Sequence, residues 1–326
     1  MSDLHLAKDI SGKGLAKEPM KAGYGRGLVE AGKQNDQVVA ASSDVSGSTG
    51  TDPFAKEFPD RFIEVGVAEQ NLVTVGSGLA AMGKLPYVAA YAAFSPGRNW
   101  EQIRTTIALN DQPVKIMSTH VGVSDAPDGA THQMLEDIAL MRSLPNMTVI
   151  APCDSLEAER VTIALAAYPK PAYVRIARDD TPIITTADTP FKIGKAYVYT
   201  EGSDLTILST GRMTYHALLA AERLFKDGID VEVIHCPTIK PLDTETILRS
   251  VRKTKRVVTA EEAQITGGFG GAIAELLVEE CPVSMKRVGV NDRFGESGKP
   301  EELFELLGLT AKHIVFAAHS VMDQRG

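Results

Sequence analysis

The sequence is poor in cysteine and has no long apolar run. Its three cysteines, Cys153, Cys236 and Cys281, are isolated from one another. An odd number without paired spacing excludes a disulfide framework and a zinc ribbon, so we expect a reducing compartment, by default the cytoplasm. No stretch approaches the roughly 20 apolar residues of a membrane span, and the polar N-terminus lacks a signal-peptide core. We therefore expect no membrane partner.

The sequence also lacks a dense basic run. It carries 34 basic and 42 acidic residues, which gives a formal net charge of -8. A protein that binds a phosphate backbone needs clustered positive charge, so we expect no nucleic-acid partner. With 326 residues, 44% of them hydrophobic, the chain is long enough for two globular domains.

Apolar β-branched runs alternate with amphipathic segments along the chain. This alternation predicts parallel sheets covered by helices. The predicted fold class is α/β, with two domains, each a mostly parallel helix-covered sheet. In the first half we expect strands near 37–41, 62–65, 86–90, 114–118, 148–151 and 172–176, and helices near 24–33, 69–82, 100–109, 136–144 and 156–167.

A stretch rich in Thr, Asp and Pro separates the two halves. Residues 179–191 have no helical period and predict an interdomain linker. We expect an N-terminal extension at 1–19, a first domain at 20–178 and a second domain at 192–326. In the second domain we expect strands near 205–209, 230–234, 256–259 and 285–290, and helices near 215–225, 244–252 and 270–280.

The most informative motif is RFIEVGVAEQNLVTVGSGLAAMG, residues 61–83. A β-branched strand runs into a turn at Gly66, and Glu69 follows in the first turn of a helix. Position alone explains Glu69 as a carboxylate that interacts with the helix dipole. The small residues that follow, Gly76 and Gly78 among them, predict a helix packed tightly in the core or at a subunit contact, because each helical glycine costs about 1 kcal/mol.

Two further stretches carry candidate chemistry. YVAAYAAFSPGRNWEQIR, residues 87–104, places Tyr91 and Phe94 at the end of an apolar strand. In the segment 119–146, His120 and His132 flank an Asp-Gly turn at Asp128, in a loop after an apolar strand. α/β proteins bind ligands in such loops, although a histidine there can also be a satisfied structural residue.

Together these stretches resemble the transketolase family, over nearly the whole chain from about Lys21 onward. The resemblance implies a thiamine-diphosphate pyrimidine-binding domain followed by a transketolase C-terminal domain that mainly helps dimerisation. It implies that Glu69 is catalytic and hydrogen-bonds N1′ of the cofactor's aminopyrimidine, and that Phe94 stacks on this ring with Tyr91 nearby. The chain departs from the family pattern by one residue after Phe94, so nothing is transferred to residues 95–100.

The resemblance also implies substrate contacts for the sugar. His120 and His132 would contact the donor ketose near its carbonyl and hydroxyls, orienting it or moving protons, and Asp128 would bind the neighbouring hydroxyl. The family's Gly-Glu before this aspartate is replaced here by Ala126-Pro127, which leaves the sugar open. Weaker matches give Arg178, Ser48 and Lys21 as phosphate contacts and Asp44 as a cofactor-facing residue.

One part of a full family member is not found in this sequence. No Gly-Asp-Gly motif and no Asn-Asn pair are present to hold a metal and diphosphate. We therefore expect no metal ligand in this chain. The cofactors would be thiamine diphosphate and Mg²⁺ (or Ca²⁺). The metal would be held by a partner, an N-terminal transketolase subunit with the diphosphate-binding domain. The two subunits would form an α2β2 assembly in which this chain is β and also self-associates.

The predicted function is a subunit of a split transketolase, active only with its partner, that transfers a two-carbon ketol unit between sugar phosphates. The alternative is the β subunit of a 2-oxo acid dehydrogenase, which shares the layout and does not need the loop that contains Asp128. Deoxyxylulose-phosphate synthase has similar motifs but carries the diphosphate domain in the same chain. A non-catalytic regulatory subunit is disfavoured because Glu69, Phe94 and both histidines are present.

Overall fold

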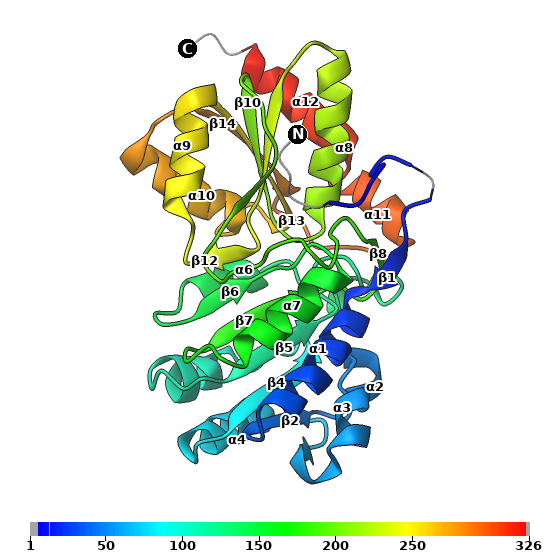
Figure 1. Cartoon of the computed structure of the whole chain (residues 1–326), viewed down its shortest axis with the longest axis vertical. Helices are drawn as coiled ribbons and strands as arrows, with labels where there is room; N and C mark the ends of the chain where they lie inside the picture. Colours follow the sequence, from blue (N-terminus) through cyan, green and yellow to red (C-terminus); the bar gives the residue numbers. More distant parts are fainter. Residues whose placement is uncertain (1–5, 13, 324–326) are drawn as a thin grey trace.

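The computed structural model describes residues 6–12 and 14–323, so part of the expected extension at 1–19, residues 1–5 and 13, lies outside it, as do residues 324–326. Two sheet-based units are stacked along the long axis of the molecule (Figure 1). The first has a seven-stranded sheet of order β12-β6-β7-β5-β4-β2-β3, and the second a five-stranded sheet of order β14-β13-β10-β11-β9. The predicted α/β class is confirmed.

The strands of the first sheet are parallel, except that β12 is antiparallel to β6. The expected strands and helices are found within a few residues of their predicted positions. The strands of this unit are β2 (Val38–Ser42), β3 (Phe62–Glu64), β4 (Leu85–Tyr91), β5 (Lys115–Thr119), β6 (Thr148–Ile150) and β7 (Ala172–Ile176). Its helices are α1 (Met20–Gln34), α2 (Ser46–Thr49), α3 (Asp52–Glu57), α4 (Glu69–Ala81), α5 (Trp100–Gln102) with a π-helical continuation (Ile103–Ala108), α6 (Asp137–Arg142) and α7 (Ser155–Leu165).

In the second unit, α8 and α12 flank one face of the sheet and α9 and α10 the other (Figure 1). Its strands are parallel except for β9. They are β9 (Tyr197–Thr200), β10 (Leu205–Ser209), β11 (Val231–His235), β13 (Arg256–Gln264) and β14 (Ser284–Val290). The helices are α8 (Met213–Lys226), α9 (Thr244–Thr254), α10 (Phe269–Glu280), α11 (Pro300–Leu306) and α12 (Ala311–Met322). None of the helices in the described part of the chain combines the length and the apolar character needed to cross a bilayer.

Two short strands cross the boundary that the sequence suggested. β12 (Thr238–Lys240), from the second half of the chain, pairs with β6 of the first sheet. β8 (Asp180–Pro182), at the start of the Thr/Asp/Pro-rich stretch, pairs antiparallel with β1 (Lys17–Pro19). Each has three residues, too few to show an alternating pattern, which is why neither was predicted. One apolar cluster also runs through both units, from Leu72 in α4 to Phe269 in α10.

Glycines set the closest helix contacts. A Cβ atom on Gly23 of α1 would lie 1.8 Å from the carbonyl oxygen of Ser155 at the start of α7. In α4, a Cβ on Gly76 would lie 2.8 Å from Val88 Cγ1, whereas one on Gly78 would meet nothing within 4 Å. The predicted tight packing of α4 is therefore confirmed for the face that carries Gly76, while Gly78 faces open space in this chain.

Candidate active site

The predicted site residues follow the carboxyl ends of neighbouring parallel strands, β7, β5, β4, β2 and β3. Because these ends lie along one edge of a parallel sheet, loops from distant parts of the sequence meet there, as ligand sites of α/β proteins require. The residues are Asp44 and Ser48 after β2, Glu69 after β3, Tyr91 and Phe94 at the end of β4, His120, Asp128 and His132 after β5, and Arg178 after β7. Lys21 lies at the start of α1.

Glu69 is the first residue of α4 and is only 4% exposed. Its carboxylate is paired: Arg98 Nη1 lies 2.8 Å from Glu69 Oε2. The same guanidinium lies over the ring of Phe94, with 4.8 Å from its carbon to the ring centroid. Asn99, which is fully buried, donates from Nδ2 to the Glu69 carbonyl at 2.8 Å. Glu69 is thus held by a dedicated pair of residues, beyond any interaction with the helix dipole.

Four rings form a continuous row beside this carboxylate. The rings of Tyr91 and His120 are stacked with 3.8 Å between centroids, and those of Tyr91 and Phe94 with 6.2 Å. His132 meets Phe94 edge to face at 5.4 Å. Within the row, the Tyr91 hydroxyl donates to Ser48 Oγ at 2.8 Å. The structure therefore brings these five predicted residues into one contiguous group.

His120 is held in a restricted state. It is 3% exposed, and its φ of 61° is in the left-handed region, which non-glycine residues seldom adopt and which is common at functional sites. Its Nδ1 lies 2.8 Å from Thr119 Oγ1. Burial, with the positive charges of Arg178 and Lys21, lowers the pKa of His120 to about 3. A neutral ring at physiological pH suits hydrogen bonding to a carbonyl or hydroxyl better than proton uptake.

A buried carboxylate, that of Asp125, ties the loop after β5 to Arg178. Asp125 is fully buried and forms an ion pair with Arg178, whose side chain is 40% exposed. Burial raises the pKa of Asp125, an effect that the positive charge of Arg178 opposes. Asp128 itself is exposed at the predicted turn, where Gly129 has a φ of 76°. The half-buried His132 has Nδ1 3.0 Å from Thr131 Oγ1.

The second unit fixes this loop by direct contacts. The Gly298 amide donates to the Ala126 carbonyl at 3.1 Å, and Gln133 Nε2 donates to the Glu296 carbonyl at 2.9 Å. Glu262 Oε1 accepts from the Val123 amide at 2.7 Å. The C-terminal domain, expected to serve mainly as scaffold, therefore also positions the loop that carries the candidate substrate residues.

Two predicted residues are less closely connected. Among the described residues, Lys21 is linked to the group by its charge, which helps to lower the pKa of His120. Asp44 is exposed, and its amide donates to Glu64 Oε1 at 2.7 Å, which ties the loop after β2 to the turn that precedes Glu69. Among the described residues, no contact joins the Asp44 carboxylate to the row of rings.

Sequence reasoning missed Arg98, Asn99 and Asp125. The first two lie in residues 95–100, where the chain departs from the family pattern, so no correspondence was available. A cationic residue shortly after Phe94 was a usable signal, because the Ser95-Pro96-Gly97 sequence between them predicts a turn that brings the two residues together. Asp125 is one of several acidic residues in its loop, and only its complete burial distinguishes it.

The donor set fits the aminopyrimidine half of the expected cofactor. One small region offers a buried carboxylate on Glu69 and the ring face of Phe94, and one planar cation, the guanidinium of Arg98, already contacts both. A planar ring with an N–H donor in its plane meets the same requirements.

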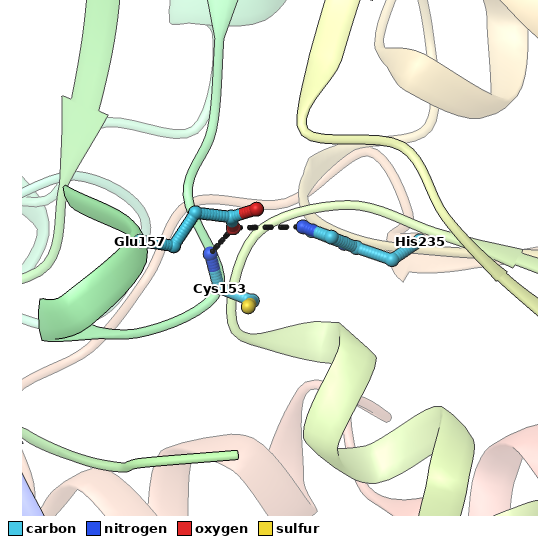
Figure 2. Close-up of side chains that lie close together, drawn as sticks. All are labelled: Cys153, Glu157 and His235. Carbon is cyan, nitrogen blue, oxygen red and sulfur yellow. Dashed lines mark hydrogen bonds and ion pairs between the residues drawn. The ribbon is translucent and has the colours of Figure 1, made fainter. Parts of the chain in front are cut away.

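A second group of chemically interesting side chains lies between the two units. Potential ligand atoms of Cys153, Glu157 and His235 fall within 4.8 Å of one another, all buried (Figure 2). Glu157 Oε2 accepts from the Cys153 amide at 2.7 Å and lies 2.8 Å from His235 Nε2, while His235 Nδ1 lies 2.8 Å from Thr214 Oγ1. Burial raises the pKa of the Cys153 thiol well above its usual value. With both imidazole nitrogens engaged and the thiol protonated, these residues form an interdomain hydrogen-bonded cluster.

Comparisons with known proteins agree with this arrangement. Residues 17–183 match the family model described as transketolase, pyrimidine binding domain, and residues 194–314 match transketolase, C-terminal domain. A chain of Methanocaldococcus jannaschii, provisionally described as a transketolase C-terminal section, is 45% identical over 94% of this chain and 96% of its own length. The 6-deoxy-6-sulfo-D-fructose transketolase subunit SqwH of a Clostridium species is 42% identical over 91% and 92%. A solved split gene transketolase, an inactive beta4 tetramer, superposes with a TM-score of 0.88 at 43% identity, over 93% of this chain and 98% of that one.

Proposed function

Since this chain belongs to the transketolase family and carries its pyrimidine-binding and C-terminal domains, we propose that it is one subunit of a thiamine-diphosphate-dependent enzyme that transfers a two-carbon ketol unit between sugar phosphates. The observation that carries the proposal is the buried Glu69 carboxylate, which the Arg98 guanidinium links to Phe94 and so to the row of rings that ends in His120 and His132. When bound, thiamine diphosphate supplies the electron sink for the ketol unit.

The geometry supports the cofactor-binding roles that the family resemblance implies. Glu69 hydrogen-bonds N1′ of the aminopyrimidine and holds or returns the proton at that atom. Phe94 stacks on the ring face. Tyr91, fixed by its hydrogen bond to Ser48, packs against the rings of both Phe94 and His120. A row of rings locked in this way restricts the cofactor to one orientation, which is the main contribution that a protein makes to such a reaction.

Exposure and charge support the substrate-binding roles that the family resemblance implies. Neutral His120 and the half-buried His132 hydrogen-bond the ketose near its carbonyl and hydroxyls. The exposed Asp128 accepts from the hydroxyl on the neighbouring carbon. Arg178, held by Asp125, binds the terminal phosphate, a task that suits its planar fork of donors. Lys21 and Ser48 add phosphate contacts, with Asp44 facing the cofactor.

The remaining parts are assigned to a partner. The diphosphate and its Mg²⁺ (or Ca²⁺) are held by a subunit with the diphosphate-binding domain, and two copies of each chain form an α2β2 assembly. The free thiols of Cys153 and Cys236, both buried, suit the reducing cytoplasm in which we place the enzyme.

The loop around Asp128 favours ketol transfer over the decarboxylation of a 2-oxo acid, since a polyol must be bound there. A relative acts on 6-deoxy-6-sulfo-D-fructose, so a modified sugar belongs among the candidate donors. In this loop the family's Gly-Glu pair is replaced by the fully buried Ala126 and the exposed Pro127. We propose that this change widens or neutralises the sugar channel.

The test is a ketol-transfer assay with thiamine diphosphate and Mg²⁺. This chain alone, the partner alone and their mixture are compared with a panel of ketose phosphate and sulfonate donors and aldose phosphate acceptors. We expect turnover in the mixture only. Turnover of a 2-oxo acid but of no ketose in the same mixture would replace the proposal with its decarboxylase alternative.

A further inference from the structure

We propose that Arg98 is a placeholder. Its guanidinium occupies the aminopyrimidine seat, the position beside the Glu69 carboxylate and the Phe94 ring, and leaves this position when the cofactor binds. The inference rests on the proposed function, because it takes Glu69 and Phe94 to be the groups that bind the aminopyrimidine. It concerns a residue that the family pattern did not assign.

A single group makes both contacts expected of the cofactor ring. Arg98 Nη1 lies 2.8 Å from Glu69 Oε2, and the guanidinium carbon lies 4.8 Å from the centroid of Phe94. A guanidinium is planar, donates hydrogen bonds within its plane and stacks on aromatic faces. An aminopyrimidine that donates from N1′ has the same three properties. The two groups therefore compete for the same carboxylate and the same ring.

The burial of the two partners explains why a placeholder is needed. The Glu69 side chain is 4% exposed, and a carboxylate at that depth without a partner is costly. The Arg98 side chain is 50% exposed, so it can withdraw into solvent at little cost. Its guanidinium makes these two contacts and no other ion pair within the part of the chain that the structure describes.

The exchange needs only a side-chain rotation. The neighbouring Asn99 is fully buried and donates from Nδ2 to the Glu69 carbonyl at 2.8 Å and to Ser95 Oγ at 3.1 Å. The Arg98 amide donates to the Phe94 carbonyl at 3.0 Å. These bonds hold the backbone of the loop against the start of α4 whatever the position of the guanidinium.

The consequence is a competition that weakens cofactor binding in the wild-type protein. Removing the guanidinium removes the competitor and leaves the seat intact. A half-exposed ion pair and one cation–π contact are each modest, so we expect Arg98→Gln to lower the Kd for thiamine diphosphate by roughly threefold to tenfold. Arg98→Lys keeps the charge but loses the planar stacking on Phe94, and its Kd should lie between the two.

The experiment is isothermal titration calorimetry of thiamine diphosphate, with Mg²⁺, into the full complex of this chain and its diphosphate-binding partner. The wild type, Arg98→Gln, Arg98→Lys and the matched control Arg104→Gln are compared. Arg104 lies in the same segment, is exposed, and loses the same charge when replaced. Melting temperatures of the free chains check that each variant folds.

Tighter binding for Arg98→Gln, with Arg104→Gln within twofold of the wild type, supports the placeholder. Equal or weaker binding for a folded Arg98→Gln overturns it, because Arg98 would then stay beside the cofactor and assist Glu69. A wild-type complex that binds no thiamine diphosphate would overturn the proposed function and the placeholder with it.

Discussion

The imidazole of His120 lies face to face with the phenol of Tyr91, with 3.8 Å between ring centroids and 28° between ring planes. This contact joins the last residue of β4 to the first residue after the neighbouring strand β5. It buries the imidazole beneath the candidate sugar site, and the nearby positive charges of Arg178 and Lys21 disfavour its protonation further. The arrangement makes His120 a fixed, neutral hydrogen-bonding group.

Stability should therefore depend on pH through His120. Its pKa is about 3 in the folded chain and near 6.5 when unfolded, so between these values the unfolded state binds the additional proton. Unfolding free energy should fall as the pH drops below 6.5, by about 1–2 kcal/mol between pH 7.5 and pH 5. His120→Asn should remove this share of the pH-dependent loss of unfolding free energy, as measured by urea denaturation at the two pH values. A decline unchanged from the wild type would contradict the burial of a neutral ring, and His319→Asn, on the exposed side of α12, is the control.

Replacing the buried carboxylate should disable catalysis without unfolding the chain. Glu69→Gln keeps the shape of the side chain but cannot hold the proton at N1′, and we expect kcat of the complex to fall by about 10²–10⁴-fold. Steady-state ketol transfer measures the loss. Glu275→Gln, which removes an exposed partner of Arg142, should keep full activity. A Glu69→Gln complex with the kcat of the wild type would instead support the hypothesis of a non-catalytic regulatory subunit.

Much of this arrangement was accessible from the sequence because it depends on local patterns. β-branched runs and amphipathic segments indicated the α/β architecture, and Glu69, Phe94, His120 and His132 were found where loops follow strands. What could not be predicted depends on pairs far apart in sequence. The Arg98–Glu69 ion pair spans 29 residues, and the contact of Gln133 with Glu296 spans 163. No periodicity reports such pairs, since the first arises only when the first unit folds and the second only when the two units pack.

The strand β12 and the protonation state of His120 could not be predicted for a related reason. β12 has three residues and joins a sheet whose other members lie more than 60 residues away in the sequence, so its identity as a strand comes from pairing with β6. The sequence left open whether His120 orients the ketose or moves protons, and burial, with the nearby charges of Arg178 and Lys21, lowers the pKa of His120 to about 3. Tertiary pairing decides that β12 is a strand, and desolvation decides the protonation state of His120.

Substrate choice should respond to Asp128. In the proposed function this exposed carboxylate accepts from the hydroxyl next to the acceptor's carbonyl, so Asp128→Ala should lower kcat/KM by about tenfold or more for hydroxylated aldehydes. Acceptors that lack the hydroxyl should be affected less than threefold. The comparison needs kcat/KM for a hydroxylated and a deoxy aldose phosphate with each protein. Equal losses for both acceptors would show that Asp128 does not bind that hydroxyl.

The α1–α7 contact should not tolerate a methyl group. A Cβ on Gly23 would lie 1.8 Å from a carbonyl oxygen of the backbone, so Gly23→Ala should lower the free energy of unfolding by about 1–3 kcal/mol. Gly78→Ala is the matched control in α4, where the Cβ would meet nothing within 4 Å, and it should be stabilising by about 0.5–1 kcal/mol. Urea denaturation of the free chain measures both. Similar changes for the two variants would show that the helices are less tightly packed than described.

The Glu157–His235 pair should stabilise the junction of the two units in a pH-dependent way (Figure 2). Burial by itself would raise the pKa of Glu157, but the charge of His235 and its hydrogen bond outweigh this and hold the pKa below its usual 4.5. Because the folded pKa is depressed, the carboxylate's contribution is complete above pH 4.5 and is lost as the pH falls through the folded value.

Glu157→Gln should therefore destabilise the chain by about 1–3 kcal/mol at pH 7, since the buried Cys153 amide and His235 Nε2 lose their carboxylate partner. The difference from the wild type should shrink toward acid pH. Glu159→Gln is the control two residues away: its partner Arg26 is 43% exposed, so its loss should cost less than about 1 kcal/mol at any pH. Equal costs for the two variants at pH 7 would mean that Glu157 contributes no more than a surface ion pair, and that the junction is held by its apolar contacts.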